Sequence, residues 1–520
     1  MDMKTIDDIE INEQFAKALA LMERGDRHIF VTGRAGTGKS TLLEYFRATT
    51  AKNIVVLAPT GVAAVNVGGQ TVHSFFGFKP DITVEKAERG AKRAVKMGRA
   101  GIYRRIETLV IDEISMVRAD LFDCADAFMR TVLGKRKLPF GGVRLAMIGD
   151  LYQLPPVVTS SERGIFEGHY ASPFFFDSRV YDEMGVEIVE LEKIYRQQGG
   201  RFVEILNAIR NNTASDDDIA VLNERFDPNA TSGEAHQIHL TSLNREADGI
   251  NVERLAVLRG RSRRFEAEVS GEFDRKSYPA ATELRLKVGA QVMLLNNDFL
   301  GRWVNGTIAC VKKMDADGVE VRLPDGSVEE VGPFVWDMFR FDLGGDGRSI
   351  VSRSVGRFQQ LPLMLAWAVT IHKSQGKTFD SAVIDVGRAF APGQVYVALS
   401  RMRTMDGMIL KSRLRSGHVR VDYRVVNFLT NHQYELSERL MPLDEKVGMI
   451  EDAIEGGLSL NITYLKSSDV KSTRVIEPIE VGEMEYAGKP FLGVRATCRM
   501  RGEERVFRVD RILDMERVTT

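Results

Sequence analysis

One segment, Gly33-Arg-Ala-Gly-Thr-Gly-Lys39-Ser40, constrains this chain more than any other. The apolar run at residues 29–31 predicts a buried strand before it, and residues 40–46 predict the start of a helix after it. Glycines allow backbone N–H groups to curl around phosphates at the positive end of a helix. Lys39 would reach the outer phosphates, and the Ser40 hydroxyl would hold Mg²⁺. We therefore predict a nucleotide site that uses Gly33, Gly36, Gly38, Lys39, Ser40 and Thr41.

Polar residues follow two further strands that the sequence predicts. Residues 109–111 lead into Asp112 and Glu113. Asp112 would hold the metal through its water shell, and Glu113 would orient and activate the attacking water. Residues 144–148 lead into Gly149-Asp150-Leu-Tyr-Gln153, where Gln153 is placed to sense the terminal phosphate. A solvated turn does not explain polar groups at three strand ends, so we predict a parallel α/β sheet with its site at the strand carboxyl ends.

Composition adds limits. A chain of 520 residues is too long for one core and should form several domains. The first ten residues are polar and acidic and do not resemble a secretory signal, and no stretch approaches the roughly 20 apolar residues of a membrane span. Three dispersed cysteines, Cys124, Cys310 and Cys498, indicate a reducing cytoplasm and argue against a disulfide frame or zinc site. Lys+Arg 71 nearly balance Asp+Glu 72, so contacts with nucleic acid would come from local patches.

Several further segments occur in one order over residues ~11 to ~410, and together they resemble the Pif-type helicases of superfamily 1B, a group related to RecD. The resemblance is most specific between residues 110 and 157, where Pro139-Phe-Gly-Gly142 is similar to a signature of that family. The matching segments are APTGVAA, TVHSFF, VIDEISM, PFGG, GDLYQLPPV, LEKIYRQ, LTSLNREADGIN, AWAVTIHKSQGKTFD and GQVYVALSR.

The resemblance implies two RecA-like P-loop lobes that bind ATP and Mg²⁺ between them. It implies that Arg196 and Arg401 reach the site from the second lobe as arginine fingers, which offset charge in phosphoryl transfer. Gln14 resembles the adenine-reading glutamine of such motors, although it also fits an ordinary exposed helix position. The expected activity is ATP-dependent 5′→3′ DNA helicase or translocase action on single-stranded DNA and on tailed or forked duplex, in DNA repair, replication or recombination. The residues expected to act in hydrolysis are Lys39, Asp112, Glu113, Gln153, Arg196 and Arg401.

Candidate DNA contacts lie in both lobes. Pro59, Thr60 and Gly61 follow a predicted strand at residues 54–57, so their backbone and hydroxyl groups could grip phosphates. His73 and Phe75 could offer a base-stacking surface, whereas an apolar phenylalanine pair also fits a core and Phe76 fits the core better. In the second lobe, Thr370, His372, Lys373 and Ser374 match a motif that contacts the strand and relays nucleotide state; His372 alternatively fits a turn histidine.

We expect six regions, one of which, lobe 2A, is formed by two stretches of the chain. They are lobe 1A at residues 1–190 with a small 1B insertion at about 79–105, lobe 2A at 191–251 and 361–430, an SH3-like β-barrel 2B insertion at 252–360, a linker at 431–446, and a C-terminal domain at 447–520. The 1B insertion carries a basic run, for which a DNA-facing element and a solvated helix face are equally good interpretations. In the barrel, Lys287 and Arg302 are candidates for phosphate contact.

The last region resembles a WYL domain, the small β-rich module of bacterial regulators, although Pro490-Phe491-Leu492 stands where the name-giving Trp-Tyr-Leu would be. Residues 494–501 alternate between apolar and arginine-rich positions, as on a strand. An arginine-lined face suits a nucleotide or single-stranded DNA ligand, or is a solvated face balanced by Glu503 and Glu504. The candidate ligand residues are Arg495, Arg499, Arg501 and Arg505.

The sequence thus predicts a cytoplasmic, nucleoid-associated monomeric helicase with a regulatory WYL domain. Two alternatives remain open: a RecD-like subunit of a recombination complex, and a WYL-regulated, DNA-stimulated ATPase that acts as a switch. Unwinding of a tailed duplex by the purified chain would distinguish them, because a switch hydrolyses ATP without separating strands.

Overall fold

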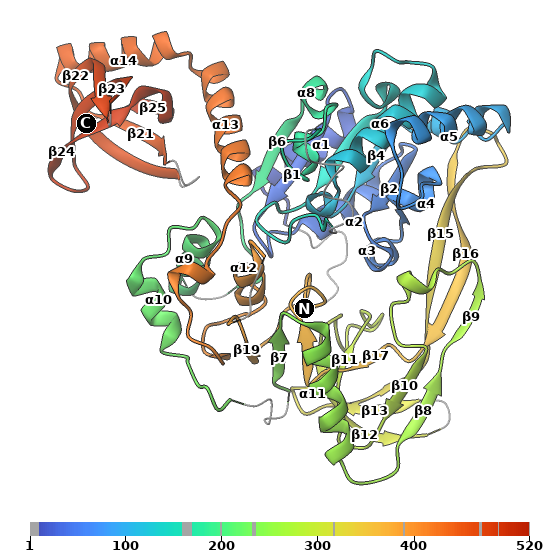
Figure 1. Cartoon of the computed structure of the whole chain (residues 1–520). Helices are drawn as coiled ribbons and strands as arrows, with labels where there is room; N and C mark the ends of the chain where they lie inside the picture. The colour runs from blue at the N-terminus through green and yellow to red at the C-terminus, as the bar shows by residue number, and fades with distance from the viewer. Residues whose placement is uncertain are drawn as a thin grey trace. The chain divides into compact units, whose positions relative to one another are not determined.

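The computed structural model describes residues 10–158, 169–197, 200–230, 236–315, 318–387, 391–466, 471–486 and 488–518 (Figure 1). The start of the chain, where we expect no secretory signal, lies mostly outside these residues. The chain divides into two compact units: Met1–Leu206 with Asp216–Arg420, and Asn207–Ser215 with Val421–Thr520. No helix in the described part of the chain is long and apolar enough to cross a membrane.

The first lobe of unit 1 is built on a six-stranded parallel sheet with the order β3-β2-β4-β5-β1-β6. Every residue of β1 and β4 is buried, which is why these strands appear in the sequence as continuous apolar runs. The strands whose ends carry the predicted site groups, β4, β5 and β1, are neighbours, so the parallel α/β prediction is confirmed. The strands are β1 (Ile29–Gly33), β2 (Ile54–Ala58), β3 (Gln70–Thr71), β4 (Thr108–Ile111), β5 (Arg144–Ile148) and β6 (Glu187–Leu191).

Helices of the first lobe begin at short polar caps. The Asn12 side chain accepts a hydrogen bond from Phe15 N at the start of α1, and Thr83 accepts one from Lys86 N at the start of α5. Helix α5 packs on α6 through the buried Ala87 and Ala91. The helices are α1 (Glu13–Arg24), α2 (Lys39–Thr49), α3 (Gly61–Asn66), α4 (Val72–Phe76), α5 (Val84–Lys96), α6 (Ala119–Leu133) and α8 (Tyr181–Met184).

The second lobe has a four-stranded parallel sheet with the order β18-β7-β19-β20. Its short helix α12 is buried at every residue. The strands are β7 (Ile238–Thr241), β18 (Ala368–Thr370), β19 (Ala382–Ile384) and β20 (Met408–Leu410). The helices are α9 (Gly200–Arg210), α10 (Asp216–Asn223), α11 (Asn244–Val257) and α12 (Gln394–Leu399).

The insertion in the second lobe is antiparallel β-structure, as expected, but its residues form three sheets. A five-stranded sheet, β14-β13-β12-β11-β17, encloses a core that includes Trp303 and Trp367. A three-stranded sheet, β15-β16-β9, extends from it as a long hairpin toward α4 and α5 (Figure 1). At the first lobe, Ile350 N donates to Asn53 Oδ1 at 3.0 Å. The strands are β8 (Arg263–Glu266), β9 (Glu268–Gly271), β10 (Glu283–Leu286), β11 (Gln291–Leu294), β12 (Ile308–Met314), β13 (Val319–Arg322), β14 (Val328–Val331), β15 (Phe334–Leu343), β16 (Ile350–Gln360) and β17 (Leu363–Leu365).

Unit 2 has a five-stranded antiparallel sheet, β24-β23-β22-β21-β25, and α14 contributes Ile450 and Ala453 to its core. The expected linker at 431–446 is helical: it comprises the end of α13 and the beginning of α14. Ser437 Oγ donates to the backbone carbonyls of Ile512 and Leu513 at the start of β25. It accepts a hydrogen bond from the buried Lys446 Nζ at 2.8 Å. The elements are α13 (Tyr423–Leu440), α14 (Leu443–Gly456), β21 (Leu460–Leu465), β22 (Lys471–Tyr486), β23 (Lys489–Cys498), β24 (Glu503–Arg508) and β25 (Ile512–Arg517).

Candidate active site

The predicted phosphate loop joins β1 to α2. Gly33, Gly36 and Gly38 have φ of +152°, +84° and +88°, so the loop uses a backbone conformation that favours glycine. Lys39 Nζ donates to the carbonyls of Gly33 and Arg34 at 2.7 and 2.9 Å and so lies over the start of the loop. Ser40 is exposed in the first turn of α2, with Thr41 half-buried beside it. This is the arrangement that a phosphate chain at a helix N-terminus requires.

The two carboxylates at the end of β4 are placed beside this loop. Glu113 has φ +49°, a left-handed conformation that is strained for a non-glycine residue. Burial and the adjacent Glu113 raise the pKa of Asp112 to about 7, and Lys39 opposes this shift. Burial also raises the pKa of Glu113, against the charge of Lys39.

These groups fit a magnesium ion. Two neighbouring carboxylates that repel each other would be stabilised by a cation, and carboxylate and hydroxyl oxygens are the ligands that Mg²⁺ prefers. Asp112 and Ser40 are therefore suitable holders. In the described residues no group of three or more His, Cys, Asp and Glu side chains is arranged to bind a metal.

Both predicted arginines reach this region from the second-lobe side. A Cβ on Gly36 would lie 2.5 Å from Arg196 Cβ, so the arginine packs directly on the phosphate loop, and its Nη2 donates to Gly376 O at 3.1 Å. Arg401 is 1% exposed, and its guanidinium bonds to Val397 O at 2.9 Å and Ser400 Oγ at 2.8 Å. Burial and then the charge of Arg196 lower the pKa of Arg401 to about 9, while Glu113 opposes the shift, which places these charges within electrostatic reach.

Gln153 links the two lobes. Its Nε2 donates to Asp150 Oδ2 at 3.0 Å, and its Oε1 accepts from Gln375 Nε2 at 3.5 Å. A Cβ on Gly393, the residue that begins α12, would lie 2.5 Å from Gln153 O. Gln153 therefore contacts residues of both lobes, and its role as a sensor of the terminal phosphate stays a prediction.

Three contributors to this site were missed at the sequence level: Tyr396, Gln375 and Gly393. Tyr396 OH accepts from Ala35 N at 3.1 Å. Each lies within a segment that carried the resemblance, but its contact is made by a residue more than 200 positions away. Sequence spacing carries no signal for such contacts.

The expected adenine-reading residue, Gln14, is half-buried in the first turn of α1. Two positions earlier, Asn12 Nδ2 donates to Tyr195 OH at 3.2 Å. This bond joins the start of α1 to the segment that carries Arg196. The position of Gln14 is compatible with a base at the rim of the site, and its role stays a prediction.

Some first-lobe DNA candidates are accessible. Thr60 is exposed and its Oγ1 accepts from Ala63 N at 3.2 Å as the cap of α3, with Pro59 half-buried before it. Gly61 packs directly on Ser277 of the insertion, with no room for a side chain. His73 is half-buried, and burial lowers its pKa.

The structure contradicts a stacking role for Phe75. Its side chain is 7% exposed and makes edge contacts with Phe76, Tyr103 and the hairpin residue Phe341. Phe75 belongs to an aromatic core, because the inserted hairpin covers the face that the sequence suggested was open. Phe76 lies in the same core, as expected.

In the second lobe, Lys373 is exposed and His372 is half-buried, so both can meet a DNA strand. The side chains of Thr370 and Ser374 cannot, because they are 4% and 0% exposed. Ser374 Oγ donates to Ile371 O at 2.7 Å, and Thr370 Oγ1 accepts from Lys373 N at 3.4 Å. These two residues shape the turn that presents its exposed neighbours.

Basic residues differ between the two insertions. Lys86 of the 1B region pairs with Asp81, but seven other basic residues there are exposed and form no ion pair within the described residues; they are Arg89, Lys92, Arg93, Lys96, Arg99, Arg104 and Arg105. The barrel candidates are instead engaged in structure. Lys287 Nζ donates to Leu258 O at 2.8 Å, and Arg302 pairs with Asp298 at 2.7 Å and stacks over Trp303. Neither is available for a phosphate.

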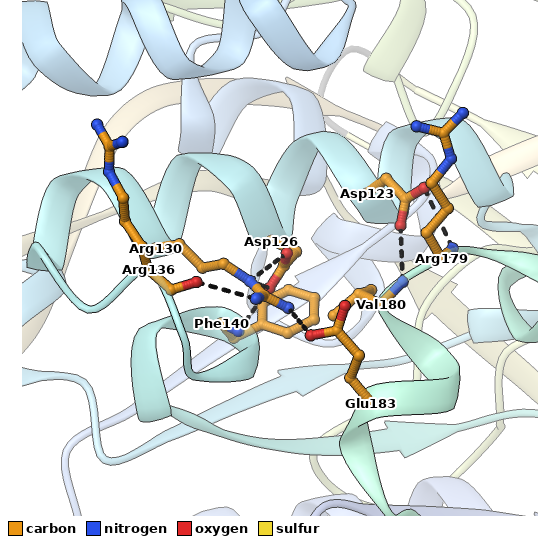
Figure 2. A network of polar contacts seen from close by, with 8 residues as sticks. All are labelled: Asp123, Asp126, Arg130, Arg136, Phe140, Arg179, Val180 and Glu183. Carbon is orange, nitrogen blue, oxygen red and sulfur yellow. Dashed lines mark hydrogen bonds and ion pairs between the residues drawn. The ribbon is translucent and has the colours of Figure 1, made fainter.

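The Pro139–Gly142 segment is held by a buried polar network (Figure 2). Phe140 is fully buried at φ +48°, and its N–H donates to Asp126 Oδ1 at 2.6 Å. The other partner of Asp126 is Arg130, which also pairs with Glu183 at 2.7 Å. The segment is therefore a rigid internal support of the first lobe.

In unit 2, the predicted arginine face is largely neutralised. Arg495 bonds to Glu480, Arg499 to Glu477, and Arg505 to Glu503. Arg501 is exposed in the turn after β23. Three of the four candidates are thus compensated by carboxylates, which favours the solvated-face interpretation over an anion site.

Comparison with known proteins agrees with this geometry. A PIF1-like helicase family model matches residues 10–218, and a WYL domain model matches residues 445–517. The chain is 33% identical over 416 residues to the ATP-dependent DNA helicase Pif1 of Bdellovibrio bacteriovorus, covering 78% of this chain and 88% of that protein. It is 36% identical to human ATP-dependent DNA helicase PIF1, covering 81% of this chain but 63% of the human protein, less than two thirds of its length.

Solved structures give the same result. A crystal structure of Bacteroides sp. Pif1 in complex with ADP-AlF4 superposes with a TM-score of 0.76 at 36% identity, covering 82% of this chain and 98% of that chain. The unliganded Bacteroides Pif1 superposes with a TM-score of 0.72, covering 81% and 97%. The chain therefore belongs to the PIF1-like helicase family and carries a WYL domain at its C-terminal end.

Proposed function

We infer that this chain is an ATP-dependent DNA helicase. The observation that carries the inference is the convergence of the phosphate loop, the Asp112–Glu113 pair and two second-lobe arginines on one site between two parallel-sheet lobes. The names of its relatives support this, since the proteins that it matches over most of its length are ATP-dependent DNA helicases.

Each residue then has a role in hydrolysis. With ATP bound, Lys39 would exchange the carbonyls of Gly33 and Arg34 for phosphate oxygens, and Ser40 and Asp112 would hold Mg²⁺, which would supply positive charge against the phosphates. Glu113 orients the attacking water and is the carboxylate placed to accept its proton; burial raises the pKa of this carboxyl. Arg196 and Arg401 stabilise the transferring phosphoryl group from the second lobe.

The substrate that we propose is single-stranded DNA with an adjoining duplex. A Bacteroides Pif1 has been solved bound to ssDNA, and a Pif1 structure describes unwinding at forked dsDNA. In this chain, Thr60, His73, His372 and Lys373 are accessible for strand contact. The exposed cations at positions 89, 92, 93 and 96 of α5 are suited to the phosphates of the duplex. We further propose a monomer with a cytoplasmic, nucleoid-associated location and a ligand-sensing role for the WYL domain.

Polarity is tested with two duplexes, one with a 5′ and one with a 3′ single-stranded tail, incubated with protein, ATP and Mg²⁺. We expect strand separation of the 5′-tailed duplex alone. Separation of the 3′-tailed duplex alone would refute the 5′→3′ assignment. DNA-stimulated hydrolysis without any separation would refute the helicase assignment and favour a switch or a subunit that needs partners.

A further inference from the structure

Helix α12 bonds directly to the phosphate loop through one of its side chains. The Tyr396 hydroxyl accepts a hydrogen bond from Ala35 N at 3.1 Å, and the two residues are 4% and 5% exposed. They are 361 positions apart, one in each lobe. A buried hydrogen bond between lobes fixes their relative position more strongly than an exposed one, because no water competes for it.

Arg401 depends on the same helix for its position. Its guanidinium bonds to Val397 O and Ser400 Oγ, both within α12 or at its end. The arginine therefore moves with the helix, and whatever fixes α12 also fixes Arg401. Five positions separate Tyr396 from Arg401.

Tyr396 also lies close to both arginines. Burial lowers the pKa of Arg196 and of Arg401, and the Tyr396 oxygen partly opposes the shift of each. Because Tyr396 affects the pKa of both arginines, its phenol lies near both guanidinium groups. Gly36, the residue after Ala35 in the phosphate loop, accepts a hydrogen bond from Tyr195 N at 2.9 Å. The segment that carries Arg196 is therefore bonded to the same loop.

We propose that Tyr396 is a positioning residue for ATP hydrolysis, whose hydroxyl fixes α12 to Ala35 and thereby sets where Arg401 meets the terminal phosphate. The proposal rests on the proposed function and adds to it a residue that acts through Arg401. Tyr396 does not transfer a proton in this role.

The test uses the full chain with Tyr396→Phe, which removes the hydroxyl and keeps the ring. We expect kcat for DNA-stimulated ATP hydrolysis to fall about three- to tenfold, the range of one buried hydrogen bond, with the KM for ATP within about twofold. A matched control is Tyr103→Phe. The Tyr103 hydroxyl is also buried and donates to Phe75 O at 3.1 Å, but Tyr103 belongs to the aromatic core and not to the phosphate loop or to α12. The control should lose thermal stability comparably and keep kcat.

A double mutant separates positioning from a general structural effect. If Tyr396 acts through Arg401, then Tyr396→Phe should cause no further loss of kcat in an Arg401→Ala background. A full additional loss in that background, a kcat unchanged by Tyr396→Phe, or a rise in KM alone would each overturn the proposal. Absence of DNA-stimulated hydrolysis in the wild-type chain would instead overturn the proposed function.

Discussion

Gly393→Ala tests the contact between α12 and the Gln153 segment. Gly393 begins α12 at φ +77°, and an added Cβ would lie 2.5 Å from Gln153 O and 2.6 Å from Tyr152 O. Ordinary contact begins near 3.4 Å, so the helix must retreat by about 0.9 Å. The left-handed conformation adds about 1 kcal/mol, since alanine lacks the freedom of glycine there.

The retreat should lower the rate of hydrolysis as well as the stability. Helix α12 carries Tyr396 and leads to Arg401, and a displacement of about 1 Å at a reacting centre costs up to about 10²-fold in rate. We expect kcat to fall ten- to a hundredfold, while the free energy of unfolding of unit 1 falls by about 2 to 4 kcal/mol, the sum of about 1 kcal/mol of backbone strain and about 1 to 3 kcal/mol of overpacking.

Steady-state ATP hydrolysis at saturating DNA measures this, with urea unfolding in parallel. Gly134→Ala is the matched control, because Gly134 has φ +70° and an added Cβ meets no atom within 4 Å. The control carries the backbone strain without the collision. A Gly393→Ala kcat within threefold of the Gly134→Ala kcat would refute the reasoning.

Four other outcomes are expected. Lys39→Ala should abolish ATP hydrolysis while DNA binding stays measurable by fluorescence anisotropy; persistent hydrolysis would refute the site. Asp126→Ala should lower the free energy of unfolding by about 3 kcal/mol in urea, because the buried Phe140 N–H loses its acceptor and an ion pair is broken. Burial lowers the pKa of His28 to about 4 from 6.5, so its unfolded form binds more protons and about 3 kcal/mol of stability is lost as pH falls from 6.5 to 4; His28→Asn should flatten that part of the urea-midpoint profile. Deleting residues from ~447 onward should leave the motor folded by circular dichroism but alter DNA affinity or coupling, and unchanged binding and unwinding would contradict a regulatory WYL domain.

The parts of the fold that the sequence predicts well are buried strands and the phosphate loop. The strand at Arg144–Ile148 has the bounds that the sequence predicts, and residues 145–148 form the buried apolar run that marks it. In a parallel sheet covered on both faces the strands are mostly apolar, so the run and the strand differ here only by the half-buried Arg144. The loop is equally local, because three glycines and Lys39 act within eight residues.

Contacts between distant segments could not be predicted in this way. From the sequence alone, Phe75 fits a stacking surface and a core residue equally well. In the structure, Phe341 of the inserted hairpin covers Phe75, so Phe75 is a core residue. The alternation expected over residues 494–501 holds only to Cys498, where β23 ends, so Arg495 is on the strand whereas Arg499 and Arg501 lie in the turn after it. The pairing of Arg495 with Glu480 depends on the register of β22. That register shifts at a bulge between Pro478 and Glu480, which neighbouring residues do not specify.

Helix α12 contacts both the hydrolysis site and the segment through which the chain leaves unit 1. At its first turn, Gly393 N donates to Arg420 O at 3.0 Å, and Arg420 is the last residue of unit 1 before the chain enters unit 2. At its other end, Arg401 takes its orientation from the helix itself. Helix α12 therefore contacts the phosphate loop through Tyr396, and its N-cap Gly393 contacts both the Gln153 segment and Arg420, where the chain leaves unit 1. A helix with so many fixed contacts cannot shift at one of them without changing the others, which explains why all of its residues are buried although it is a single short helix.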